Sequence, residues 1–135
     1  MIFAQSAFEL RCEWGLQGVS QLAPISDVVV IVDLLSFSTS VEIATNNGAV
    51  IFPYQWRDSS ASDYARKVKA ELARQERKPS SGYSLAPSSL IDIPAGTKLV
   101  LPSPNGATLS LKTNSKPTIA GCLRNAEAVA HFARR

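Results

Sequence analysis

Cysteine, histidine and long apolar runs are all scarce in this sequence, and each shortage argues against a class of protein. The two cysteines, Cys12 and Cys122, are far apart and form no CxxC pair. This spacing argues against a zinc knuckle or a disulfide scaffold and favours a reducing, cytoplasmic location. The only histidine, His131, lies near arginines, so no Ser–His or Cys–His catalytic pair is supported.

Membrane and nucleotide-binding signals are also missing. The apolar run at 28–32 is stopped by Asp33, far short of the ~20 residues that a membrane helix needs. Residues 1–5 lack the basic start of a secretory signal. Neither the GxxxxGK[ST] nor the GxGxxG pattern occurs. We therefore expect no membrane partner.

The composition is that of one folded domain, 1–135. Its residues are 45% hydrophobic and 19% charged, which is too apolar for a disordered chain and enough for a modest core. The net charge of +3 is small, and the basic residues at 62–78 are interleaved with acidic ones, as on a solvated face. No nucleic-acid partner is expected, and a basic nucleic-acid-binding module is the least favoured function.

Strand-like and helix-like stretches alternate along the chain. Strands are expected at 8–13, 28–34, 49–54, 97–101 and 118–121. Helices are expected at 16–22, from a capping box of Thr39 and Glu42 to Asn46, and at 60–77, 107–111 and 125–135. The alternation predicts an α/β fold: a layered α/β/α sandwich with a mostly parallel or mixed sheet, incomplete in this chain. The Pro- and Ser-rich stretch 79–94 is predicted to be a mobile surface segment.

Three junctions share the order strand, small polar loop, helix: 33–39, 103–108 and 121–125. If their strands are parallel, all three loops meet at the carboxyl edge of the sheet, where open α/β folds bind ligands. The candidate site residues there are Asp33, Ser36, Ser38, Thr39, Ser103, Asn105, Gly106, Arg124 and Asn125.

These residue types suit a phosphate or another oxyanion. Helix N-termini offer free N–H donors, Arg124 adds a permanent forked cation, and Asp33 can hold a hard cation such as Mg²⁺. The competing interpretation is structural: Thr39 and Asn125 are ordinary caps, and 104–106 is a common turn. Asp33 is harder to explain in that way, since a carboxylate at the end of an apolar strand is costly without solvent, a partner or a metal.

At the same junctions the sequence resembles the 2-phosphosulfolactate phosphatase family, Mg²⁺-dependent enzymes of coenzyme M biosynthesis. The resemblance covers nearly the whole chain, and the matching pieces occur in the family's order. They are Cys12-Glu13-Trp14-Gly15, Val32-Asp33-Leu34-Leu35-Ser36-Phe37-Ser38-Thr39, Asn47-Gly48-Ala49, Leu101-Pro102-Ser103-Pro104-Asn105-Gly106-Ala107 and Ala120-Gly121-Cys122-Leu123-Arg124-Asn125-Ala126. Many members carry arginine where this chain has Ser36, and members continue beyond residue 135.

The resemblance implies a phosphatase that hydrolyses a small phosphomonoester such as 2-phosphosulfolactate with Mg²⁺. Asp33 and Arg124 are then catalytic, with Asp33 as metal ligand or nucleophile, and the remaining candidates bind substrate. The chain is expected to correspond to the N-terminal part of such an enzyme and to self-associate. The alternative is a truncated or non-catalytic homologue that keeps an anion-binding pocket.

Overall fold

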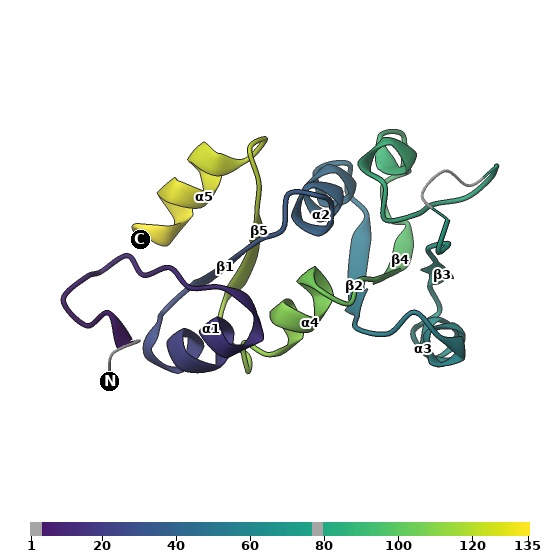
Figure 1. Cartoon of the computed structure of the whole chain (residues 1–135). Coiled ribbons are helices and arrows are strands. Elements are labelled where there is room, and N and C mark those ends of the chain that lie inside the picture. Colours follow the sequence, from purple (N-terminus) through teal and green to yellow (C-terminus); the bar gives the residue numbers. More distant parts are fainter. Residues whose placement is uncertain (1–3, 77–79) are drawn as a thin grey trace.

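The computed structural model describes residues 4–76 and 80–135, in which helices and strands alternate (Figure 1). The helices are α1 (Gly15–Leu22), α2 (Phe37–Asn46), α3 (Ser59–Val68), α4 (Gly106–Leu111) and α5 (Ala126–Ala133), with 3-10 helices η2 (Ala23–Ile25) and η3 (Pro87–Leu90). The strands are β1 (Val29–Val32), β2 (Val50–Tyr54), β3 (Glu71–Leu72), β4 (Lys98–Pro102) and β5 (Thr118–Gly121). Within the described ranges, no helix combines the length and apolar character needed to cross a membrane.

The strands form two sheets, and every strand pairing in them is parallel. β1 pairs with β5, and Val32 lies opposite Gly121. In the second sheet β4 lies between β2 and β3, and Tyr54 lies opposite Pro102. The expected α/β class with parallel strands is therefore confirmed, as an open arrangement whose sheet is incomplete.

Helices cover both sides of the strands. Figure 1 shows α2 and α5 on one side and α1, α3 and α4 on the other. α2 packs against β2 and β5, whereas α4 packs against β1 and β2. These two helices therefore hold the two sheets together from opposite faces.

The main apolar core lies around β4, the central strand of the larger sheet. Leu99 and Leu101 of β4 are fully buried and belong to one cluster with Phe37 and Ala44 of α2 and Leu90 of η3. A strand buried on both faces needs apolar residues at every position, which explains the continuous apolar run in β4. By contrast, α5 has no buried residue.

The helix expected at 60–77 is shorter in the structure. α3 ends before Lys69, which adopts a left-handed conformation with φ of 53°. The chain then forms β3 at the sheet edge, and the N–H of Ala73 donates to the carbonyl of Val100 over 2.9 Å. Leu72 suits a strand as well as the predicted helical stripe, and pairing with β4 decides between the two.

The expected capping box is wrong. α2 begins at Phe37, so Thr39 and Glu42 both lie inside the helix. The Thr39 hydroxyl donates to the carbonyl of Leu34 over 2.9 Å, and the Glu42 carboxylate accepts from Arg124. Their spacing matched the capping pattern, but the N-cap is Ser36, so the helix starts three residues earlier than the pattern predicts.

The strand expected at 8–13 does not form. No strand pairs with these residues in the described part of the chain, and Phe8 and Leu10 are 64% and 89% exposed. Arg11 fixes the segment instead, donating from Nη1 to the carbonyl of Ile25 over 2.8 Å. The alternation of apolar residues is therefore not enough to form a strand here, because no described strand edge lies beside the segment for its backbone to pair with.

The predicted surface segment 79–94 contains core residues. Position 79 lies outside the described residues, but Leu90 and Ile93 are only 0% and 3% exposed. The hydroxyl of Ser40 in α2 donates to the carbonyl of Leu85 over 2.7 Å. The second half of this segment is thus packed against α2, because its apolar residues complete the core.

Candidate functional site

The carboxyl ends of β1 and β5 lie side by side. Their register places Val32 opposite Gly121, so the next residues, Asp33 and Cys122, leave the sheet at the same edge. Two of the three predicted loops therefore start together, as expected from parallel strands.

The third loop reaches the same edge through a close contact between two helix starts. Gly106, the first residue of α4, is buried, and a Cβ at this position would overlap the ring of Phe37, the first residue of α2. Since α2 follows the loop after β1, this contact joins 103–108 to 33–39. The three loops are thus linked by contacts, but the prediction of a single sheet edge is only partly met, because 103–108 follows β4 of the second sheet.

We predict that Gly106→Ala destabilises the protein by about 1–3 kcal/mol, because an added methyl group forces the Phe37 ring out of its place. Urea unfolding measures the change. The double variant Gly106→Ala with Phe37→Ala should lose less than the sum of the two single losses, since alanine lacks the Cγ and Cδ1 atoms of Phe37 that the added methyl group overlaps. Additive losses would contradict the contact.

Asp33 is the residue of the site with an unengaged charge. It is half-buried, and its carboxylate has no hydrogen bond or ion pair within residues 4–76 and 80–135. Its backbone is held firmly: the N–H donates to the Ser38 hydroxyl over 3.0 Å, and the carbonyl accepts from the Ser38 N–H over 2.9 Å. The main chain is fixed while the carboxylate stays available.

The hydroxyl groups of Ser38 and Thr39, which follow β1, bond to backbone groups of their own loop. Ser38 is fully buried, and its hydroxyl donates to the carbonyl of Ile31 over 2.6 Å besides accepting from Asp33. Thr39 is engaged with Leu34, as described above. Ser36, which precedes α2, is 3% exposed. Ser38 and Thr39 therefore shape the loop that presents Asp33.

We predict that Ser38→Ala lowers the free energy of unfolding by about 1–3 kcal/mol, because it leaves buried backbone groups of Asp33 and Ile31 without their partner. Chemical denaturation measures the loss. Ser62→Ala is the matched control, since Ser62 is exposed on α3 and should change stability by less than about 0.5 kcal/mol. Equal effects of the two variants would show that the buried hydroxyl does not hold the loop.

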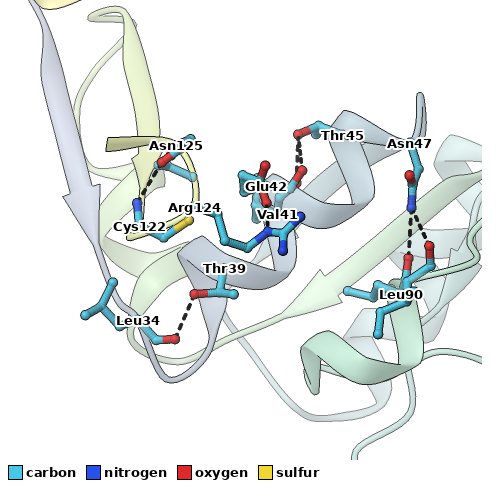
Figure 2. A network of polar contacts seen from close by, with 12 residues as sticks. Leu34, Thr39, Val41, Glu42, Thr45, Asn47, Leu90, Cys122, Arg124 and Asn125 are labelled. Carbon is cyan, nitrogen blue, oxygen red and sulfur yellow. Dashed lines mark hydrogen bonds and ion pairs between the residues drawn. The ribbon is translucent and has the colours of Figure 1, made fainter. Parts of the chain in front are cut away.

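The other two loops are built in the same way. The Ser103 hydroxyl accepts from the Gly106 N–H over 3.2 Å, and Asn105 is exposed at the start of α4. The Asn125 side chain accepts from the Cys122 N–H over 2.9 Å (Figure 2). It also donates to the Ala120 carbonyl over 2.9 Å. Asn125 thus precedes α5 as expected, but its side chain holds the turn after β5 instead of capping the helix.

Arg124 is tied to α2 by an ion pair. Its Nε donates to Glu42 Oε2 over 2.6 Å, and the two side chains are 54% and 13% exposed (Figure 2). The terminal nitrogens of the guanidinium make no further bond within the described residues. Glu42 therefore orients Arg124 and leaves part of its fork open.

Comparisons of the chain with family models, with curated proteins and with solved structures found no match. The site consequently stands on its own residues. In the described part of the chain, no group of three or more His, Cys, Asp or Glu side chains is arranged to hold a metal. Asp33 is the candidate metal ligand that the geometry leaves available.

Sequence reasoning missed Glu42 as a site residue. Its position after Thr39 matched a capping pattern, which concealed its role as the partner of Arg124. A signal was present, since α2 starts at the same sheet edge as 121–125, and an acidic residue one turn into it can meet a basic residue of that loop.

Proposed function

We propose that this chain carries the site of a Mg²⁺-dependent phosphatase that acts on a small phosphorylated acid such as 2-phosphosulfolactate. The observation that carries the proposal is that an unengaged carboxylate, Asp33, and a partly open guanidinium, Arg124, belong to two loops that leave the β1–β5 sheet at the same edge. The resemblance of the junction sequences supports the same chemistry.

Arg124 is assigned to an oxyanion of the substrate. A guanidinium offers a rigid fork of donors that matches a phosphate or carboxylate. Because Glu42 holds its Nε, the terminal nitrogens are the ones that would contact the substrate. Asn105, exposed at the start of α4, is a further polar contact at this edge.

Asp33 fits a Mg²⁺ ion of the kind that substrate phosphates complete. Magnesium often binds one or two protein carboxylates, with water and phosphate oxygens as its other ligands. One free carboxylate without a metal cluster matches that pattern. Bound there, the ion would neutralise charge on the phosphoryl oxygens. Asp33 as the attacking nucleophile remains the alternative role, and the two roles predict different intermediates.

The side chains of Ser38, Thr39, Ser103 and Asn125 take positioning roles in this proposal, since they bind backbone groups of their own loops. The site then has fewer direct substrate contacts than the sequence predicts. The small number of direct contacts favours a small substrate. It also supports the alternative of a non-catalytic homologue that binds anions.

The test is phosphate release from 2-phosphosulfolactate and from p-nitrophenyl phosphate, with Mg²⁺ and after its removal by EDTA. We expect release that depends on Mg²⁺. Inorganic phosphate binding without release would favour the non-catalytic alternative. If the chain neither releases nor binds phosphate, the proposal of a phosphate site is wrong.

A further inference from the structure

A groove separates the two sheets. It has a volume of about 260 Å³ and is walled by β5 on one side, β2 on the other, and side chains of α2 and α4 at its faces. The strands contribute Thr118 and Ala120 from β5, and Ile51 and Pro53 from β2. None of the described residues that line it is charged. Figure 1 shows β5 and β2 flanked by the same two helices.

The edge of β2 that faces the groove has unused backbone groups. Val50 donates its N–H to Thr97, and the Tyr54 carbonyl accepts from Ser103, each over 2.8 Å. Bonding direction alternates along a strand, so Ile51 and Pro53 turn their backbone groups away from β4. The Pro53 nitrogen, which carries no hydrogen, therefore points toward the groove. Its missing N–H costs the pairing of β2 with β4 no hydrogen bond.

The edge of β5 that faces the groove is equally unpaired. The N–H of Val29 donates to the Pro117 carbonyl over 2.9 Å, and the same alternation turns Thr118 and Ala120 away from β1. The Ala120 carbonyl is taken by Asn125. In the described part of the chain, no partner is found for the N–H groups of Thr118, Ala120 and Ile51, or for the carbonyls of Thr118, Ile51 and Pro53.

Two unpaired strand edges thus face one apolar groove. We propose that the groove binds an extended polypeptide segment, from outside these 135 residues, as an additional strand between β5 and β2. This proposal is independent of the phosphatase proposal. Donors and acceptors on both walls match the backbone of a strand, which carries both on each edge.

The chain itself leaves too little sequence to fill the groove. β5 and β2 have four and five residues, whereas the undescribed positions are the triplets 1–3 and 77–79. The occupant therefore comes from elsewhere. Because helices cover both faces and the described lining residues carry no charge, the side chains of the occupant are small and uncharged.

The test uses a capped peptide of alternating valine and alanine flanked by lysines, and amide hydrogen exchange of this chain by NMR. At saturating peptide, the amides of Ile51, Thr118 and Ala120 should exchange at least about tenfold more slowly, while those of Phe52 and Ile119 change little. The same peptide with proline at alternate positions should have no effect. Unchanged exchange at the three amides would overturn the proposal.

A filling variant checks the position. Ala120→Trp places a large side chain in the groove and should weaken peptide binding at least about tenfold, whereas Ala128→Trp, on an exposed position of α5, should not. Circular dichroism verifies that both variants fold. If Ala120→Trp does not fold, the exchange experiment decides alone. Protection that appears without peptide and grows with protein concentration would place a second copy in the groove and overturn the assignment of a foreign strand.

Discussion

Asp33→Asn is expected to reduce Mg²⁺-dependent phosphate release at least ~100-fold, because the variant removes the carboxylate charge from the site. Asparagine keeps the size of the side chain, and the backbone bonds from Ser38 do not depend on the carboxylate. The thermal midpoint should therefore hold or rise slightly. Steady-state kinetics across a range of Mg²⁺ concentrations measure the loss.

Asp27→Asn is the matched control for this variant. Asp27 is exposed and precedes β1, so the same chemical change is made at the opposite end of the strand. We expect it to leave activity unchanged. If Asp33→Asn retained full activity, Asp33 would be structural. If excess Mg²⁺ restored the variant, the metal-ligand role would be favoured over the nucleophile role.

Arg124→Ala is expected to lower kcat/KM by about 30-fold or more, since truncating one partner of a close charged contact commonly costs ~2–5 kcal/mol. Arg124→Lys should recover only part of the loss, because lysine keeps the charge but not the fork. Glu42→Gln should lower activity less than Arg124→Ala, since the guanidinium remains but is less firmly oriented.

Arg134→Ala serves as the control for loss of a positive charge. Arg134 is exposed beyond the last turn of α5, away from the loop that carries Arg124. It should leave kcat/KM unchanged. Equal losses in the two alanine variants would indicate a general effect of net charge rather than a contact with substrate.

The class of the fold and the meeting of the loops could both be predicted from the sequence. Apolar runs at 28–34 and 97–101 predict strands, and parallel strands bring their following loops to one edge. This inference depends only on strand order and direction. The inference therefore holds even though the predicted lengths of individual helices and strands were wrong. The full burial expected for the first run is wrong, since Val32 of β1 is 66% exposed, whereas β4 is buried from Leu99 to Pro102.

The roles of the polar side chains could not be predicted in that way. Ser38 and Asn125 look like substrate contacts in the sequence, but each binds backbone groups of its own loop. Whether a hydroxyl or amide side chain bonds to the backbone of its own loop depends on the exact residue at which the following helix starts. The capping pattern of Thr39 and Glu42 predicted the wrong first residue for α2. Because Glu42 was assigned to the cap, its ion pair with Arg124 was not predicted.

The uneven distribution of the core has a consequence for how a ligand would act. The buried cluster gathers around β4, whereas α5, beside the loop that carries Arg124, has no buried residue. Opening of α5 and the turn before it should therefore require less free energy than opening of β4. A phosphate ion held by Arg124 would stabilise the weaker half preferentially. Ligand binding would thus be seen first as slower proteolysis near residue 124, before any rise in the global melting temperature.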